Sequence, residues 1–226
     1  MVDKKLIIAI DGPSGAGKST ISRQVAHRLN YVHLDTGAMY RCVALAVTRK
    51  AIDLADTVAL SSLCETLEIR FVPEGHGQRV ICDSEDVSEA IRTPKNSLMT
   101  SRVAAISLVR DAMVELQRQM GAAGGVVLEG RDIGSVVFPE ADAKFYLDAS
   151  AKERGRRRYE ELKGKGVDVD LEKTVSEIVE RDLADSSREH SPLVKAEDAI
   201  LVDSTNMSIE EVILFMLQKV GDKAGQ

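Results

Sequence analysis

The chain has 226 residues, and 30 Lys and Arg against 36 Asp and Glu give it a formal net charge of −6. An acidic protein repels the phosphates of nucleic acids and anionic lipids, so we expect neither a nucleic-acid partner nor a membrane partner. A hydrophobic content of 44% is typical of a globular protein, and the apolar runs are far shorter than the roughly 18 residues that span a bilayer. Three cysteines without CxxC spacing predict neither a disulfide framework nor a zinc site, which favours a reduced, cytoplasmic compartment.

The N-terminal region has the pattern of a strand, a loop and a helix. Leu6–Ile10 is a continuous apolar run, typical of a strand buried on both faces, and Ile21, Val25 and Leu29 then repeat every four residues, as in a helix. Similar runs recur downstream and are separated mostly by segments of helical period, so the sequence predicts an α/β fold with a parallel sheet covered by helices on both faces. These runs are Tyr31–Leu34, Val126–Leu128, Ala143–Leu147 and Ile200–Val202.

Two regions depart from this alternation. The first contains three short segments rich in β-forming residues, Glu68–Val72, Arg79–Cys82 and Asp86–Val87. The turn-forming residues 73–77 link the first two segments, which predicts a small antiparallel meander inserted into the α/β frame. Leu162–Asp170 contains two glycines and alternating charges without apolar periodicity, so we expect a mobile loop there.

A phosphate-binding motif lies between the first strand and the first helix. The residues Gly12-Pro13-Ser14-Gly15-Ala16-Gly17-Lys18-Ser19 fit GxxxxGK[ST] in full. In such a loop, backbone N–H groups surround a phosphate at a helix N-terminus, the lysine reaches the β and γ phosphates, and the Ser19 hydroxyl can ligate Mg²⁺. The motif does not identify the acceptor, because GTPases, ATPases and small-molecule kinases all use it.

Other features of the sequence favour a kinase. A GTPase would need an NKxD motif to read guanine, and that tetrapeptide does not occur. In a mechanical ATPase the apolar run that ends at Glu129 would continue with a second acidic residue, whereas here Gly130-Arg131-Asp132 follows.

Four arginines cluster on a predicted helix that runs into the 162–170 loop; they are Arg154, Arg156, Arg157 and Arg158. An isolated run of this kind is usually a solvated basic face. Beside a phosphate loop in an acidic chain we favour an anion-binding role, because transfer between two phosphates requires concentrated positive charge.

A second charged group lies on another predicted helix. Arg181, Asp185 and Arg188 are four and three residues apart, which places them on one helix face. They form either an intrahelical ion-pair ladder or a face that binds a nucleotide through guanidinium and carboxylate groups. Spacing alone leaves both interpretations open.

Several motifs together resemble the bacterial cytidylate (CMP/dCMP) kinases. They are Asp11–Ser19, the LDTGAMYR stretch at 34–41, GRDIG at 130–134, the Arg181, Asp185 and Arg188 set, and Asp203-Ser204-Thr205. The resemblance spans nearly the whole chain and implies a P-loop NTPase-type core with a five-stranded parallel sheet, a monophosphate-binding lobe that contains the meander, and a short lid. We therefore expect one domain, 1–226, with a core at about 1–35, 110–150 and 171–226, the lobe at about 36–109 and the lid at about 151–170.

The resemblance also implies roles for individual residues. It implies ATP binding by Gly12, Pro13, Ser14, Gly15, Ala16, Gly17, Lys18, Ser19, Thr20, Ser204 and Thr205, and catalytic roles for Lys18, Arg131, Arg154, Arg156 and Arg158. It implies a CMP site made of Thr36, Tyr40, Arg41, Ser101, Arg110, Arg131, Asp132, Arg181, Asp185 and Arg188. Mg²⁺ would be held by Ser19 and, through water, by Glu129. Two positions differ from many members, since Thr36 replaces Ser and Glu129 replaces Asp.

The acceptor base can be matched to these side chains. Cytosine offers an amino donor at N4 and acceptors at N3 and O2, so a carboxylate such as Asp132 and a guanidinium such as Arg110 complement its edge. Uracil would face Asp132 with a carbonyl, which predicts that UMP is rejected. The activity implied is ATP-dependent phosphorylation of CMP and dCMP.

The pentose and the acceptor phosphate need other partners. Asp185 and Arg181 would hold the sugar, and Arg41 and Arg131 the phosphate, while Arg188 could serve base or phosphate. The sequence leaves open which of Asp132 and Asp185 contacts the base. We expect a monomer whose partners are CMP, dCMP and ATP.

Two alternatives remain at this point. Another P-loop small-molecule kinase, such as a shikimate or adenylate kinase, would lack the GRD motif and the meander. A nucleotide sensor that binds ATP without phosphoryl transfer would not need so many arginines. The four histidines, His27, His33, His76 and His190, are interpreted as packing or surface residues, because an ionised acceptor phosphate requires no general base.

Overall fold

The computed structural model describes residues 5–74 and 77–224, so Gly75 and His76 of the predicted turn at 73–77 lie outside the described residues. The chain divides into two compact units. Residues 34–122 form the second unit, and the segments before and after them form the first unit. Among the helices of the described residues, none has the length and apolar character that crossing a membrane would require.

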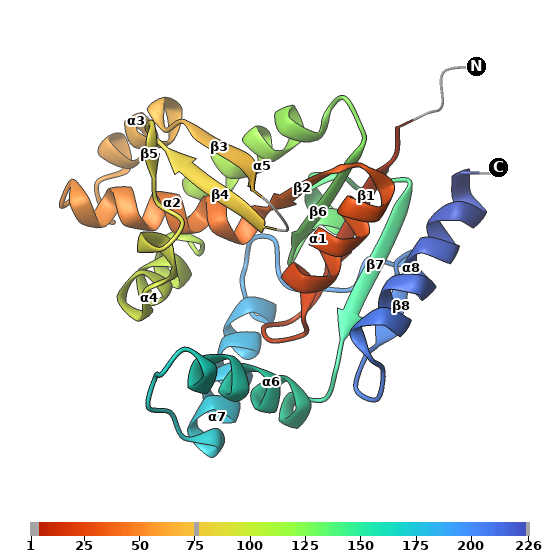
Figure 1. Ribbon diagram of the computed structural model, residues 1–226. Coiled ribbons are helices and arrows are strands. Elements are labelled where there is room, and N and C mark those ends of the chain that lie inside the picture. Colours follow the sequence, from red (N-terminus) through yellow and green to blue (C-terminus); the bar gives the residue numbers. More distant parts are fainter. Residues whose placement is uncertain (1–4, 75–76, 225–226) are drawn as a thin grey trace. The chain divides into compact units, whose positions relative to one another are not determined.

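The first unit is organised by a five-stranded sheet with the order β2-β6-β1-β7-β8 (Figure 1). The β1–β6, β1–β7 and β7–β8 pairs are parallel. This confirms the predicted five-stranded parallel sheet. The strands are β1 (Ile7–Asp11), β2 (Val32–Asp35), β6 (Val126–Gly130), β7 (Ala143–Asp148) and β8 (Ile200–Asp203).

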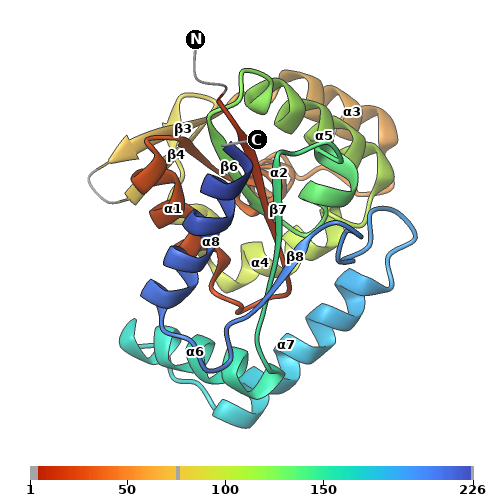
Figure 2. The ribbon, with the colours of Figure 1, turned by 90° about the vertical axis from the view of Figure 1, so that its right-hand side faces the viewer.

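Helices α1 (Lys18–Leu29) and α8 (Ile209–Ala224) pack side by side against this sheet (Figure 2). Apolar side chains from both helices and the strands, among them Val25, Phe145 and Ile213, are buried in one core. Full burial of such side chains contributes about 1.5–3 kcal/mol each, so this core fixes the strand ends that carry the site residues.

Helices α6 (Ala151–Gly164) and α7 (Leu171–Ser186) follow β7 and pack against each other. Their contact is tight at Gly155, where an added Cβ would lie 2.2 Å from the Val175 side chain. Any larger residue at 155 would push the two helices apart.

The boundaries of these helices correct two predictions. Helix α6 continues to Gly164, into the segment predicted as a loop, because its alternating charges form i,i+3 and i,i+4 ion pairs such as Arg158 with Glu161 and Glu161 with Lys165. Helix α7 ends at Ser186, so Arg188 lies beyond the helix and not on its face.

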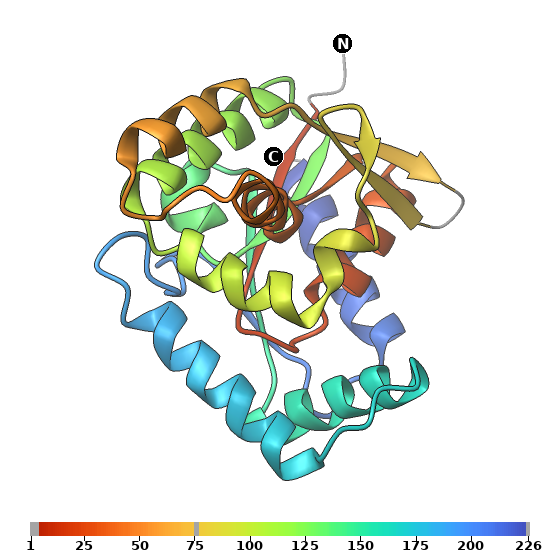
Figure 3. The ribbon, with the colours of Figure 1, turned by 90° about the vertical axis from the view of Figure 1, so that its left-hand side faces the viewer.

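The second unit surrounds α2 (Thr36–Arg49), which Figure 3 views nearly end-on. Asp35 caps this helix by accepting a hydrogen bond from the Ala38 N–H at 2.9 Å. The unit also contains α3 (Thr57–Thr66), η1 (Ala90–Arg92), α4 (Pro94–Val103) and α5 (Ser107–Gly121). The predicted antiparallel meander is confirmed as the sheet β3-β4-β5, with strands Ile69–Glu74, Gly77–Cys82 and Glu85–Asp86.

Candidate active site

The phosphate loop joins β1 to α1 and depends on two glycines. A Cβ on Gly12 would lie 2.0 Å from the Leu147 carbonyl oxygen, so only glycine allows the loop to leave β1 this close to β7. Gly17 precedes α1 with φ +93°, a left-handed conformation that a side chain disfavours. The loop therefore leads directly into a helix N-terminus, the arrangement that binds phosphate.

Lys18 is the cation of this loop and is buried in the first unit. Its Nζ donates to the carbonyl oxygens of Gly12 and Pro13, both at 2.7 Å. Burial, together with the positive charge of Arg131, holds the pKa of Lys18 well below its usual range. A bound phosphate would stabilise the charged ammonium, so the loop is complementary to an anion.

Ser19 and Glu129 form the oxygen-rich part of the site. The Ser19 hydroxyl donates to Glu129 Oε2 at 2.9 Å. Burial disfavours the charged carboxylate, but the hydrogen bond from His33 and the nearby Lys18 hold the pKa of Glu129 below its usual range. A hydroxyl beside an ionised carboxylate fits Mg²⁺, which takes few protein ligands and shares the rest with waters and substrate phosphates. Residues 5–74 and 77–224 contain no group of three or more His, Cys, Asp or Glu side chains that could hold a metal ion.

Asp11 fixes the GRDIG segment. Its buried carboxylate accepts hydrogen bonds from the Ile133 N–H at 2.9 Å and the Gly134 N–H at 2.7 Å. These two residues begin the single π-helical turn η2 (Ile133–Val137), which directly follows Asp132. Burial raises the pKa of Asp11 to about 6 although both N–H groups oppose the shift. The residue that ends β1 thus holds the backbone beside Asp132.

Arg131, Asp185 and Arg188 form a cluster of two guanidiniums around one carboxylate. Arg131 Nε donates to Asp185 Oδ2 at 2.8 Å, and Arg188 pairs with the other oxygen. Burial opposes ionisation, yet Arg131 and Arg188 hold the pKa of Asp185 below its usual range. Because Arg131 follows β6, the cluster joins separate elements and is more than an intrahelical ladder.

The four arginines of α6 have different surroundings. Arg154 is buried, and its Nη1 donates to the Ser14 carbonyl oxygen at 2.9 Å and pairs with Asp182 of α7. The same Asp182 accepts a hydrogen bond from the Ser14 N–H at 3.0 Å. Arg154 of α6 and Asp182 of α7 therefore hold the carbonyl and the N–H group of Ser14 in the phosphate loop.

Arg157 also reaches the phosphate loop. Its Nη1 donates to the Ala16 carbonyl at 3.4 Å, and its Nη2 donates to the Ser204 carbonyl at 2.7 Å. Arg156 and Arg158 instead pair with glutamates of α6 on its exposed face. Two of the three α6 arginines that the resemblance gives catalytic roles thus lie in helix-surface ion pairs in this structure.

Ser204 and Thr205, which the resemblance assigns to ATP binding, lie directly after β8. The Ser204 N–H donates to the Asp148 carbonyl at 2.8 Å, and Thr205 Oγ1 accepts the Ser150 N–H at 2.9 Å. These bonds tie the loop after β8 to the one that leads into α6.

Arg181, which the resemblance also assigned to the acceptor, lies on α7 of the first unit, and the five residues of that set between positions 36 and 110 belong to the second unit. Arg41 donates to the Ser97 hydroxyl at 2.8 Å, and the Arg110 guanidinium lies 5.3 Å from the centre of the Tyr40 ring. Thr36 is buried at the start of α2, whereas Ser101 is exposed on α4. This unit therefore holds two arginines and an aromatic ring on packed helices, with Arg110 and Tyr40 buried.

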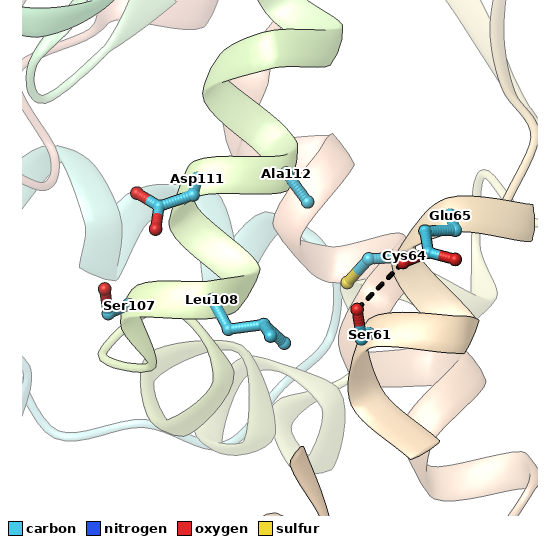
Figure 4. A pocket seen from close by; sticks show the side chains of 7 residues that line it. All are labelled: Ser61, Cys64, Glu65, Ser107, Leu108, Asp111 and Ala112. Atoms are coloured by element: carbon cyan, nitrogen blue, oxygen red, sulfur yellow. Dashed lines mark hydrogen bonds between the residues drawn. The ribbon is translucent and has the colours of Figure 1, made fainter. Parts of the chain in front are cut away.

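A shallow hollow of about 430 Å³ lies between α3 and α5 of the second unit (Figure 4). Its lining includes Cys64, Glu65, Leu108 and Asp111, and Glu65 accepts a hydrogen bond from Ser61. None of the residues assigned to ATP or CMP lines it.

Comparison with known proteins decides the family. The family model described as cytidylate kinase matches residues 8–222. Curated relatives named cytidylate kinase include one from Syntrophotalea carbinolica, 58% identical over 98% of this chain and 94% of the relative. Others come from Geobacter sulfurreducens, 56% identical over 92% and 89%, and Bacillus velezensis, 49% identical over 99% and 100%. The chain belongs to the cytidylate kinase family.

Two solved structures share the fold of this chain. A protein of Thermus thermophilus aligns with a TM-score of 0.50 at 17% identity, over 97% of both chains. An uncharacterised protein of Eubacterium ventriosum gives 0.52 at 10% identity, over 96% of this chain and 99% of the other. The chain's high identity to curated cytidylate kinases over nearly the full length makes this family member a nucleoside monophosphate kinase.

The structure of this cytidylate kinase family member also shows contacts that its motifs did not indicate. His33, Arg157 and Asp182 all touch the phosphate loop, α1 or Glu129. Arg157 belongs to the predicted arginine cluster but is not among the residues given an ATP-binding or catalytic role, although a residue three positions after Arg154 shares its helix face. The positions of His33 and Asp182 depend on packing between distant segments, and no local pattern marks them.

Proposed function

We propose that the chain transfers the γ-phosphoryl group of ATP to CMP and dCMP, giving CDP and dCDP, with Mg²⁺ required. An oxygen of the acceptor phosphate forms a bond to the γ-phosphorus while the bond to the β,γ-bridging oxygen breaks, and ADP leaves. The observation that carries the proposal is the phosphate loop beside the Arg131, Asp185 and Arg188 cluster in a chain of the cytidylate kinase family.

In this proposal the residues of the first unit act by position and charge. The loop N–H groups and Lys18 bind the ATP phosphates, and Arg131 neutralises charge on the reacting phosphates. Arg154, Arg156 and Arg158 approach the transferred group when the lid, residues 151–170, closes. No general base is needed, because the attacking oxygen belongs to an ionised phosphate.

Ser19 and Glu129 would hold Mg²⁺, which when bound neutralises phosphate charge. Asp132 would read the cytosine amino group, and Asp185 with Arg181 would hold the pentose. The resemblance alone supports a role in CMP binding for five residues of the second unit, Thr36, Tyr40, Arg41, Ser101 and Arg110. The division into core, lobe and lid also rests on the resemblance alone. Ser204 and Thr205 are proposed to lie under the adenine.

Turnover with a panel of acceptors tests this function. With ATP and Mg²⁺ we expect rapid ADP formation with CMP and dCMP, and little with UMP, AMP or shikimate. Omission of Mg²⁺ should abolish transfer. Transfer to another acceptor in preference to CMP, or ADP formation that does not depend on an acceptor, would contradict the proposal.

The lid assignment predicts a change in hydrogen exchange. Arg156 and Arg158 now pair with exposed glutamates, and these pairs contribute only about 0.3–0.5 kcal/mol each, so phosphates can draw the arginines away. We expect exchange over about residues 154–170 to slow when CMP and a non-hydrolysable ATP analogue bind together. Helix α8 serves as the internal reference. Equal exchange in residues 154–170 with and without both nucleotides would refute the lid.

A further inference from the structure

The strand β2 carries a histidine that bridges two parts of the phosphate site. His33 Nε2 lies 3.0 Å from the Ser22 hydroxyl of α1 and 3.1 Å from Glu129 Oε1 at the end of β6. The His33 and Glu129 side chains are only 11% and 4% exposed. A polar contact this well buried is held in a defined geometry.

The surrounding bonds determine where the His33 proton lies. The Ser22 hydroxyl has one proton, which it donates to the Lys18 carbonyl at 2.7 Å, so toward His33 it accepts. The ionised Glu129 carboxylate can also only accept. Both neighbours therefore act as acceptors toward Nε2, and its single hydrogen is shared between them in a three-centre hydrogen bond.

The two carboxylate oxygens of Glu129 consequently have separate partners. Oε1 accepts from His33, and Oε2 accepts from the Ser19 hydroxyl at 2.9 Å. The second bond directs the Ser19 proton toward Glu129 and leaves the lone pairs of the hydroxyl available to another partner. His33 thus acts on Ser19 through Glu129.

The length of the acidic side chain explains why such an anchor is useful. Glutamate has one more rotatable bond than aspartate, and restricting a side chain of this kind costs up to about 1.5–2 kcal/mol. A hydrogen bond to the far oxygen limits the Glu129 side chain to one orientation before any ligand binds. Preorganised oxygen ligands favour both metal binding and transfer.

We propose that His33 is a positioning residue, which donates from Nε2 to Glu129 and Ser22 and thereby orients Glu129 toward Ser19 for Mg²⁺ and phosphoryl transfer. This inference rests on the proposed function for its effect on transfer. The hydrogen bonding itself is a property of the free protein and can be measured without substrate.

The first experiment records long-range ¹H–¹⁵N spectra of the free protein labelled in histidine, with His33→Gln used to assign the His33 signals. We expect a protonated Nε2 on His33. A His33 ring with Nε2 unprotonated could not donate to Glu129 and would overturn the proposal, whether or not the protein transfers phosphate.

The second experiment compares His33→Leu, which removes the donor, with His33→Gln, whose amide can still donate. We expect His33→Leu to weaken the binding of Mn²⁺ with ATP and to lower kcat, each by about 10–100-fold, the effect typical of outer partners of metal ligands. The KM for CMP should not change, and His33→Gln should recover most of the loss. The exposed His27 of α1 provides the control His27→Leu, which should match the wild type.

The thermal unfolding midpoint of each variant shows whether a loss of Mn²⁺ binding or turnover comes from a misplaced Glu129 side chain or from a destabilised protein. If folded His33→Leu binds Mn²⁺ and turns over as the wild type does, or if His33→Gln is as impaired as His33→Leu, the proposal is wrong. A wild type that transfers no phosphate would instead refute the proposed function, and the spectra would still decide the hydrogen bond.

Discussion

Replacing Lys18 with methionine should lower kcat by about 10³–10⁵-fold, the range that cationic groups on the transferred phosphoryl contribute in related chemistry. This corresponds to about 4–7 kcal/mol of transition-state stabilisation. The structure explains the direction, because the Lys18 ammonium lies at the phosphate loop, 2.7 Å from the carbonyl oxygens of Gly12 and Pro13. Methionine has a similar length but carries no charge, so the anion loses its principal counterion.

The measurement is steady-state transfer from ATP to CMP by a variant shown to be folded by its urea unfolding midpoint. Lys219→Met provides the control, because Lys219 is a lysine of the same unit on α8, and this change should leave kcat unaltered. A folded Lys18→Met protein with near-normal turnover would show that transfer does not take place at this loop.

Asp132→Asn should narrow the preference for CMP over UMP. If the Asp132 carboxylate accepts the cytosine N4 proton, uracil places a carbonyl against it, and an unpaired buried acceptor costs several kcal/mol. The asparagine amide can donate to the uracil O4, so kcat/KM for CMP should fall steeply while that for UMP falls much less or rises. The buried Asp132 directly precedes the turn that Asp11 fixes, so the exchanged group should keep its place.

Asp185→Asn is the matched comparison. Each carboxylate oxygen of Asp185 is paired with a guanidinium, so the amide would lose one of two charge-assisted bonds and loosen Arg131 and Arg188. We expect Asp185→Asn to lower kcat/KM for CMP and for UMP by similar factors. If Asp185 holds the pentose, kcat/KM for CMP and for dCMP should fall by different factors. If instead Asp185→Asn narrows the base preference and Asp132→Asn lowers both substrates equally, the two carboxylates have exchanged roles.

The sequence by itself determined the elements whose formation depends on neighbouring residues. The phosphate loop was predictable because the apolar run before Asp11, the glycines and the helical repeat of Ile21 and Val25 are adjacent in the chain. The parallel sheet and the meander followed from equally local patterns of apolar runs and turns. The LDTGAMYR and GRDIG motifs pointed to the family for the same reason, because the residues of each motif are contiguous in the chain.

Only the tertiary structure decided which distant side chains meet. His33 and Glu129 are 96 residues apart in the chain, and they meet where α1 packs against β6. Ser14 and Asp182 are 168 residues apart, and they meet because α6 and α7 pack together and contact the phosphate loop. The end of α7 before Arg188 and the ion pairs along α6 likewise became apparent only in the structure. Local periodicity records which face of an element is apolar, but it holds no information on the partner that a polar side chain will find.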